Sequence, residues 1–496
     1  MQKKQTILVV ASLLVVVLSV TLAYFTAQII GKGKIVTINS ADLKIIFTDS
    51  DGSISGTNIE PGKWNVTKTF TIENKSNETY KYNIVIQDLV NTFVTNGYLQ
   101  YKITSTNGGY NMTEFKDVPK SETATDTILA YSVSISVGVT QSYTVEFKYA
   151  NDESVDQSND MGKKLSGTLF ITEGTEDPNK TLYNQLLVDK STKLTRTDFS
   201  KVLTDNNTNT LYTGVEDSKT VYYFAGNATD NWVKFGKNAS NQDLYWRIIR
   251  TNSDGGVRLL YHGTSTTATD AYIGTSQFNS SYNDIAYVSY MYGSSGSIAN
   301  ARTNQTNSST IKTAIDNWYT SNLEAKGYTK YLSTTAVYCN DRSTSDNKNF
   351  GARTRLDTNK TPSYDCTATE DKFTVDSPVG NGKLTYPIAL MTADEVSFAG
   401  GVYGTNAPTW YYYNSANGSS TGDTWWWLLS PYFWHGGFAD VFDVGGSSHP
   451  GYLDYIIVNG TYGVRPVISL KSCTLYSTGN GSANEPYTIK ETTSGC

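Results

Sequence analysis

The sequence predicts an exported multidomain protein with three parts: an N-terminal hydrophobic helix, an antiparallel all-β sandwich and an α+β domain. Three features lead to this expectation, namely a length of 496 residues, a charged fraction of only 17% and an apolar segment near the N-terminus. A chain of this length is too long for a single core, so two or three domains are expected. Abundant Asn, Ser, Thr, Gly and Tyr favour strands joined by polar turns over long exposed helices.

The first 30 residues are expected to be a signal peptide or a membrane anchor. Lys3 and Lys4 precede an apolar run from Ile7 to Phe25, which is long enough for either role. Cleavage after Ala23 would release the protein, whereas an uncleaved segment would anchor it in the membrane through residues 7–25. The rest of the chain is extracellular in both cases.

Charge and cysteine content exclude some classes of partner and cofactor. The net charge of −6 and an isoelectric point near 5.3 leave no basic face for a nucleic-acid backbone, so we expect no nucleic-acid partner. Four cysteines suit an oxidising compartment: Cys339, Cys366, Cys473 and Cys496. Sequential pairing would close two local loops, but three pairings are possible in principle. No cysteine or histidine spacing is typical of a metal site, and we expect no metal and no other cofactor.

Residues 31–173 predict the β-sandwich because short strands alternate with turn signals such as Pro61-Gly62. Alternation within a strand places Tyr143, Val145 and Phe147 on one face. The expected strands are Lys34–Ile38, Leu43–Thr48, Trp64–Glu73, Tyr80–Gln87, Tyr98–Thr104, Ile128–Val137, Gln141–Tyr149 and Lys164–Ile171.

Several short sequence motifs occur in order between Ala23 and Leu169. They are Ala23-Tyr24-Phe25-Thr26, Ser40-Ala41-Asp42-Leu43, Ile59-Glu60-Pro61-Gly62, Glu73-Asn74 and Leu165-Ser166-Gly167-Thr168-Leu169. In these motifs the chain resembles the camelysin and TasA family, exported β-sandwich proteins of Gram-positive bacteria, some of which assemble into biofilm-matrix fibres. The resemblance implies a location at the cell surface or in the matrix of such a bacterium, and self-assembly through the N-terminal domain. The protease activity sometimes attributed to camelysin is not expected, because this region has no histidine and no HExxH motif.

A polar linker is expected at residues 174–215, with a short helix from Leu182 to Val188. Residues 216–496 then predict the α+β domain, including a C-terminal tail closed by cysteines. Strands Leu244–Arg250 and Val257–Tyr261 flank the turn Asp254-Gly255 and predict a hairpin. One helix is expected where Ile311, Ile315 and Trp318 recur at helical spacing after Thr310. Another is expected from Thr392, because Glu395 completes a capping box, to Gly400-Gly401.

The same domain contains a second series of motifs. They are Trp232-Val233-Lys234-Phe235, Tyr245-Trp246-Arg247-Ile248-Ile249-Arg250, Asp316-Asn317-Trp318-Tyr319, Tyr386-Pro387-Ile388-Ala389-Leu390, Trp427-Leu428-Leu429-Ser430-Pro431-Tyr432 and Gly463-Val464-Arg465-Pro466-Val467-Ile468. The domain thereby resembles Firmicutes surface domains with the C-type-lectin-like fold of formylglycine-generating enzymes. It is also similar to ligand-binding domains diversified by retroelements, which implies a rigid fold that presents a variable binding surface.

Catalysis and calcium-dependent sugar binding are not implied by this resemblance. No cysteine lies between Cys366 and Cys473, whereas the generating enzymes need a reactive pair near their cleft, and the lectin motifs Glu-Pro-Asn and Trp-Asn-Asp are absent. Ser430, His435 and Asp440 could be drawn as a triad, but no GxSxG motif is present, so we expect no catalytic residues.

Fifteen aromatic residues between Trp410 and Tyr462 suggest a recognition surface. Trp425 to Pro431 reads as a buried framework strand, and Arg465 as a buried clasp bonded to carbonyl or carboxylate groups. The stretch that follows the framework strand is broken by glycines and is the expected ligand-binding face. Its candidate residues are Tyr432, Phe433, Trp434, His435, Phe438, Asp440, Phe442, Asp443, His449, Tyr452, Asp454, Tyr455, Asn459 and Tyr462.

These features favour a cell-surface or matrix binding protein of the adhesin type, not an enzyme. The expected ligand is a carbohydrate or a protein on another cell or phage surface, because aromatic rings stack on sugars and aspartates bond hydroxyl groups or meet a basic partner. A structural fibre or pilus subunit that polymerises through the N-terminal sandwich is the alternative. A surface enzyme acting on glycans ranks lowest.

Overall fold

In a computed structural model the chain divides into two compact units, Met1–Pro178 and Asn179–Cys496. It describes the backbone of strands in 35–40, 43–49 and 53–55, together with residues 61–175, 177, 180–268, 271–377, 379–412 and 425–496. The apolar segment 7–25 and the cleavage point at Ala23 lie outside the described residues. No helix within the described ranges is both long and apolar enough to cross a membrane. The described residues are mostly β-structure, as predicted.

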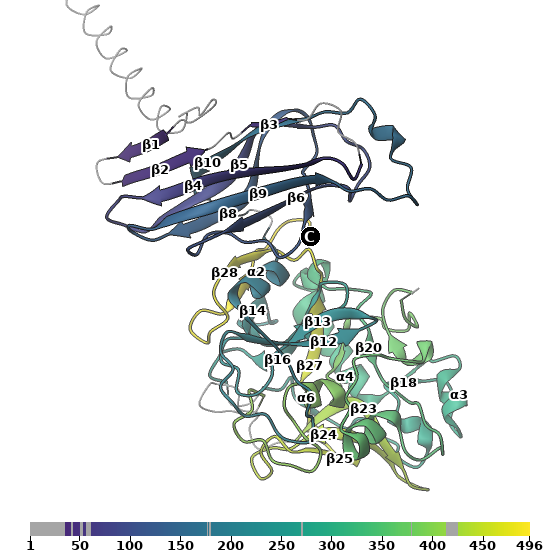
Figure 1. The fold of residues 1–496 in the computed structure, drawn as a ribbon. Helices are drawn as coiled ribbons and strands as arrows, with labels where there is room; N and C mark the ends of the chain where they lie inside the picture. Colours follow the sequence, from purple (N-terminus) through teal and green to yellow (C-terminus); the bar gives the residue numbers. More distant parts are fainter. Residues whose placement is uncertain are drawn as a thin grey trace, which may run out of the picture. The chain divides into compact units, whose positions relative to one another are not determined.

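In the part of unit 1 that is described, the strands form two antiparallel sheets (Figure 1). The first contains, in spatial order, β1 (Ile35–Ser40), β2 (Leu43–Asp49), β4 (Asn65–Asn74), β9 (Thr140–Tyr149), β6 (Leu99–Ser105) and β7 (Lys116–Asp117). The second contains β3 (Ser53–Ser55), β10 (Leu165–Glu173), β5 (Tyr80–Asn91) and β8 (Ser121–Ile135). The eight strands expected from the sequence are all present with shifted ends, whereas β3 and β7 were not predicted.

Both sheets of unit 1 contribute to one hydrophobic core. Ile72 and Val145 come from the first sheet, Ile84 and Leu169 come from the second, and all four pack in the same buried cluster. Strand β9 alternates buried and more accessible residues as its sequence predicts. Burial of one face of each sheet therefore holds this unit together.

Unit 2 is built on a large, mostly antiparallel sheet (Figure 1). Its main path is β11 (Thr192–Thr195), β12 (Thr210–Glu216), β13 (Lys219–Tyr223), β15 (Asp243–Thr251), β14 (Trp232–Lys237), β29 (Tyr487–Ile489) and β28 (Tyr476–Thr478). A branch adds β16 (Val257–Gly263), β27 (Pro466–Leu470) and β22 (Ile388–Leu390). The hairpin predicted around Asp254-Gly255 is confirmed, because β15 pairs with β16 in antiparallel register.

The segment expected to be a linker contributes secondary structure to unit 2. Helix α2 (Leu182–Asp189) covers the predicted helical stretch, and Leu182 and Leu186 are buried in the core of the unit. Strand β11 pairs with β12 in parallel, and β12 pairs with β13. Polar composition concealed this role because β11 has no buried residue and contributes mainly backbone hydrogen bonds.

A second sheet of unit 2 carries the aromatic-rich segment. Its order is β17 (Thr275–Ser276), β26 (Tyr462–Gly463), β23 (Trp426–Trp434), β24 (Ala439–Val444) and β25 (Leu453–Ile457). Two short ribbons pair β18 (Met291–Tyr292) with β19 (Asn307–Ser308), and β20 (Tyr338–Cys339) with β21 (Lys372–Phe373). Within the sheet, β23 has a neighbouring strand on each side, whereas β25 is the last strand and has only β24 as a neighbour.

Both predicted helices of the α+β region form. Helix α4 (Thr310–Tyr319) is capped by the side chain of Ser309, one residue before the expected Thr310. Helix α6 (Ala393–Phe398) has the predicted capping box between Thr392 and Glu395. Shorter helical pieces are η1 (Ser158–Asp160), η2 (Ile285–Val288), α3 (Ile298–Arg302), η3 (Thr320–Glu324), η4 (Tyr328–Tyr331), α5 (Gly351–Arg353), η5 (Thr354–Asn359) and η6 (Thr369–Asp371).

The cysteines form the two sequential pairs, Cys339–Cys366 and Cys473–Cys496, which is one of the three pairings that the sequence left open. Arg465 is fully buried and donates from Nε and Nη2 to the backbone oxygen of Tyr261, over distances of 3.3 and 3.2 Å. Its guanidinium also lies 4.8 Å from the ring centre of Trp426. The prediction that Arg465 is buried and hydrogen-bonded to a backbone carbonyl group is therefore confirmed.

Candidate functional site

A hollow of about 520 Å³ lies at the edge of the second sheet of unit 2. It is lined by His435, Phe438, Asp440, Asp454, Tyr455, Ile456 and Ile457. Five of these seven were predicted from the sequence as ligand-binding residues. Hollows of this size that combine apolar and polar side chains are typical of small-ligand sites.

The hairpin between β23 and β24 positions one wall of the hollow. Gly436 and Gly437 form its turn with φ angles of 73° and 154°, which are accessible mainly to glycine. The turn places His435 and Phe438 on either side of it, and their rings stack with centroids 5.1 Å apart. Phe438 is 45% exposed. The glycines were visible in the sequence, and Phe438 directly follows them at the end of the turn.

Phe438 belongs to a row of stacked rings that extends to Tyr282 on one side and through His435 to Phe433 on the other. Phe438 stacks on Tyr282 with centroids 5.7 Å apart, and His435 stacks on Phe433 at 5.4 Å. The Arg353 guanidinium lies 4.4 Å from the ring centre of Phe433 and 4.6 Å from that of Tyr432. Tyr282 and Arg353 were not predicted, because they lie far from the aromatic segment in sequence and only the fold brings them to it.

Strand β25 forms the other wall. Tyr455 is 39% exposed, and its ring stacks on the buried ring of Tyr432 with centroids 3.9 Å apart. Ile456 and Ile457 lie beside it in the lining of the hollow. Sequence reasoning missed both isoleucines because it selected aromatic and acidic residues. No local pattern marks them, because the position of β25 at the end of the sheet is set by the fold.

Asp440 supplies a carboxyl group to the hollow and is only 3% exposed. Its Oδ2 lies 3.2 Å from Nδ1 of His435. Burial raises the pKa of Asp440 to about 6, although the nearby His435 and Arg353 act in the opposite direction. The Asp440 carboxyl therefore changes its charge between mildly acidic and neutral pH.

Asp443 and Asp454 face each other across β24 and β25, where they are direct partners in the antiparallel register. Asp443 is fully buried, and burial together with the charge of Asp454 raises its pKa well above the ordinary value. Burial also raises the pKa of Asp454, against the effects of the Tyr455 backbone N–H and of His449. Asp454 belongs to the residues around the hollow and Asp443 does not, and the register places both side chains on the face of the sheet opposite to that of Asp440.

The remaining predicted residues do not line the hollow. Phe442 is fully buried and Tyr432 is 3% exposed, so both belong to the core, while Phe433 and Trp434 are half-buried and pack against it. Four more predicted residues lie elsewhere: Tyr462 in β26, and His449, Tyr452 and Asn459 in the connections between strands. His449 and Tyr452 lie beside Trp425, and Tyr462 packs on Trp427 with ring centres 5.2 Å apart. The Asn459 backbone oxygen accepts a hydrogen bond from Gln277.

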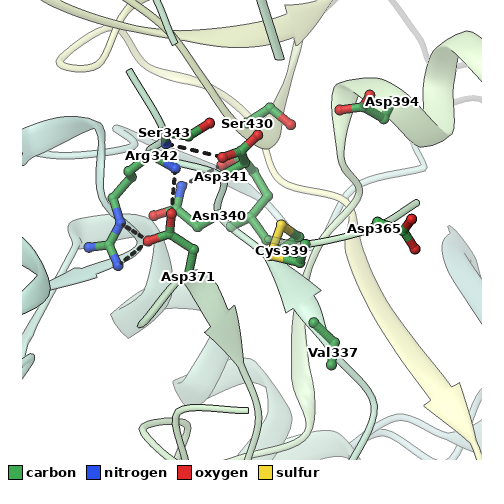
Figure 2. The surroundings of a disulfide bond; sticks show 12 residues. Val337, Cys339, Asn340, Asp341, Arg342, Ser343, Asp365, Asp371, Asp394 and Ser430 are labelled. Atoms are coloured by element: carbon green, nitrogen blue, oxygen red, sulfur yellow. Dashed lines mark hydrogen bonds and ion pairs between the residues drawn. A yellow bond between two sulfur atoms is a disulfide. The ribbon is translucent and has the colours of Figure 1, made fainter. Parts of the chain in front are cut away.

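A second, narrow cavity of about 30 Å³ lies beside the Cys339–Cys366 disulfide. Figure 2 shows Asp341, Asp394 and Ser430 near that disulfide. Ser430 accepts a hydrogen bond there from the backbone N–H of Ala393 and does not line the hollow that contains His435 and Asp440. A space of this size holds about one water molecule.

The charged groups around this narrow cavity are paired with one another. Glu395 accepts from Nε of Arg250 at 2.9 Å and from Nη1 of Arg258 at 2.7 Å. Burial alone would raise the pKa of Glu216, but its ion pair with Arg250 prevails and lowers the pKa to about 2. Arg355 binds both carboxylate oxygens of Asp394 at 2.9 and 2.8 Å. These pairs give the cluster a structural role.

The chain matches no protein-family model and no curated protein sequence. One solved structure, the crystal structure of a ruminal GH26 endo-beta-1,4-mannanase, aligns with 29% of this chain and 33% of its own chain, at 17% identity and a TM-score of 0.15. A likeness this weak and partial carries no argument about fold or activity.

Proposed function

We propose that this protein is an exported binding protein of the cell surface or extracellular matrix, and that unit 2 recognises a glycan through the hollow. The observation that carries the proposal is the combination of the exposed Phe438 and Tyr455 rings with the carboxyl group of Asp440 in one concave surface. Sugars present apolar C–H faces to aromatic rings and hydroxyl groups to carboxylates. Binding of this kind needs no chemical step.

In this proposal unit 2 adopts a C-type-lectin-like fold, and unit 1 is a β-sandwich of the TasA type that places unit 2 outside the cell. The rigid base is supplied by β23, whose residues Trp426 to Leu429 are fully buried. The ligand contacts come from the hairpin turn after β23 and from the edge strand β25. A rigid base limits the conformational entropy lost when the ligand binds.

The test is a double variant, Phe438→Ala/Tyr455→Ala, compared with the natural chain on an array of glycans and on intact cells. Loss of binding with a melting temperature close to that of the natural chain is expected, because both side chains are exposed. The matched control is Val188→Ala/Val379→Ala, which shortens two exposed apolar residues away from the hollow. Binding that survives in the first double variant would overturn the proposal.

A fibre subunit is the second candidate, and one observation favours it. Strand β1 is an edge strand: within the described residues it pairs with β2 and with no other strand. Such an edge can accept a strand from another copy. Filaments seen by electron microscopy of the full-length secreted protein, and lost on deletion of residues 24–38, would support this function. Monomeric protein that still binds glycans would refute it.

A further inference from the structure

We propose that Arg353 is a positioning residue of the hollow, because its guanidinium lies against the two rings on which both aromatic walls are stacked and so sets where Phe438 and Tyr455 meet a ligand. This inference rests on the proposed function and names a residue on which binding depends although it does not line the hollow. Three features support it: the ring contacts of the guanidinium, a bulge in β23 and the attachment of the segment that carries Arg353.

One series of ring contacts leads from Arg353 to the wall formed by β25. The guanidinium carbon lies 4.6 Å from the ring centre of Tyr432 and 4.4 Å from that of Phe433. Tyr432 in turn stacks on Tyr455 with ring centroids 3.9 Å apart. The exposed ring of this wall is therefore separated from Arg353 by a single buried ring.

A second series leads to the wall formed by the hairpin between β23 and β24. Phe433 stacks on His435 with centroids 5.4 Å apart, and His435 stacks on Phe438 at 5.1 Å. A cation on the face of a ring is attracted to it, more strongly where water is excluded. Since Arg353 contacts the first ring of both series, displacement of this one side chain would disturb both walls of the hollow.

A β-bulge in β23 allows one guanidinium to contact two consecutive residues. In a regular strand, consecutive side chains point to opposite faces of the sheet. The pairing of β23 with β24 shifts between Pro431 and Phe433, which leaves Tyr432 as the extra residue. A bulge redirects a side chain at such a position, and here both rings contact Arg353. Phe433 is the direct partner of Asp440, so the guanidinium lies on the side of the sheet that holds the Asp440 carboxyl.

The hydrogen bonding of Arg353 is incomplete, and ring contact takes its place. Nε lies 3.7 Å from the carboxylate of Asp357, whereas Nη1 is buried and donates to no described residue. Buried donors are normally satisfied, so an exception needs an explanation. The planar guanidinium can lie on ring faces in a way that the compact ammonium of a lysine does not reproduce. Replacement by lysine therefore separates the shape of the side chain from its charge.

The segment that carries Arg353 is attached to the end of β23 by backbone hydrogen bonds. The Trp434 N–H donates to the Lys348 oxygen over 2.8 Å, and the Phe350 N–H donates to the Tyr432 oxygen over 3.3 Å. Arg353 follows three residues after Phe350, in α5. The backbone on both sides of the ring contacts is thus fixed, as a positioning residue requires.

Arg353 also acts on the carboxyl group of the hollow. Burial raises the pKa of Asp440 to about 6, while the charges of His435 and Arg353 act in the opposite direction. Asp443 and Asp454 lie on the opposite face of the sheet. Loss of the charge at position 353 should therefore raise the pKa of Asp440 further, which a change in packing alone does not predict.

The first test compares Arg353→Met and Arg353→Lys with Lys348→Met in the full chain. Lys348 is an exposed cation of the same segment, and its backbone contact with β23 does not depend on its side chain. Amide hydrogen exchange of residues 434–438 and 453–457 reports on the two walls. Both Arg353 variants should exchange about tenfold faster in both walls, because two ring contacts are lost, while β15 stays protected. Unchanged exchange in either wall, or equally faster exchange in Lys348→Met, would overturn the inference.

A second measurement is the pKa of Asp440, followed by carbon-13 NMR of labelled aspartate carboxyl groups, with Asp440→Asn to assign the signal. The pKa should rise by about 0.5 in Arg353→Met, where the charge is lost. It should stay near the natural value of about 6 in Arg353→Lys and in Lys348→Met. A pKa that does not rise in Arg353→Met would contradict the inference.

Glycan binding separates this inference from the proposed function. On the array used for Phe438→Ala/Tyr455→Ala, both Arg353 variants should bind about tenfold more weakly than the natural chain, and Lys348→Met should bind equally well. Full affinity in Arg353→Lys would overturn the positioning role. A natural chain that binds no glycan would refute the proposed function, while hydrogen exchange and the pKa of Asp440 would still decide whether Arg353 positions both walls.

Discussion

The two parts of the aromatic-rich segment differ in burial although they share a composition. Trp426 and Trp427 in β23 are fully buried, whereas Phe438 and Tyr455 are 45% and 39% exposed. Strand β23 has neighbours on both sides, while Phe438 follows a glycine turn and Tyr455 lies on the edge strand β25. The position of a residue within the sheet therefore decides whether the same type of side chain stabilises the fold or remains available for a ligand.

The largest expected effect comes from the buried part. Trp427→Ala should lower the free energy of unfolding by about 3–5 kcal/mol, because it leaves a cavity and removes the indole donor to the Ser276 oxygen. Chemical denaturation of the full chain measures this change. A loss below about 1 kcal/mol would mean that the framework strand can repack and that burial of Trp427 contributes little to stability.

The buried Asp443 is expected to lower the stability of the folded protein, and substitution of this residue measures the effect. Its folded-state pKa lies well above the ordinary 3.8, so the folded protein keeps a proton that the unfolded chain has lost, and stability falls as the pH rises above about 4. Asp443→Asn removes this penalty and should raise stability by about 2 kcal/mol at pH 8 and by little at pH 4. Denaturation at both values measures the gain. The exposed Asp376→Asn is the control, and an equal gain at both values would contradict the assigned cause.

Gly436 in the turn between β23 and β24 and Gly327 elsewhere in unit 2 both have left-handed backbone, so the same substitution can be compared at the two sites. Gly436 and Gly327 have φ angles of 73° and 76°, and a Cβ atom at either meets nothing within 4 Å. Replacement by alanine should therefore cost about 1 kcal/mol at each site, through backbone strain alone. Only Gly436→Ala is expected to weaken glycan binding, because it distorts the wall formed by His435 and Phe438. Equal loss of affinity in both variants would argue against a role for this turn.

Phe438→Ala should have the smallest effect on stability. The side chain is 45% exposed, so the unfolding free energy should change by no more than about 0.5 kcal/mol. Glycan affinity measured on the same sample should nevertheless fall. A clear drop in melting temperature would show that the ring stack with Tyr282 and His435 supports the fold.

The sequence predicted the β-rich fold and much of the lining of the hollow, but with uneven success. Alternation in β9, the hairpin turn at Asp254-Gly255 and the capping box of α6 depend on neighbouring residues, and each was confirmed. The predicted site contained Phe442 and Tyr432, which are buried, because composition cannot tell which face of a strand meets the core. The cap of α4 at Ser309 was missed by one residue, which is common at helix ends.

Other features depended on contacts between distant parts of the chain. Tyr282 and Arg353 join the ring stack only after folding, so no local pattern marks them. Residues 192–195 form β11, and their polar, exposed side chains resemble those of a linker. The pairing of the cysteines was undetermined for the same reason, since it depends on which segments the fold brings together.

The position of Glu395 has a consequence for how unit 2 opens locally. This carboxylate caps α6 and also binds Arg250 of β15 and Arg258 of β16. Separation of any one of these elements would therefore leave a buried charge without its partner. A helix as short as α6 has little stability of its own. Its amide hydrogens should therefore exchange with deuterium only when β15 and β16 also open, and their protection should report the global stability of the unit.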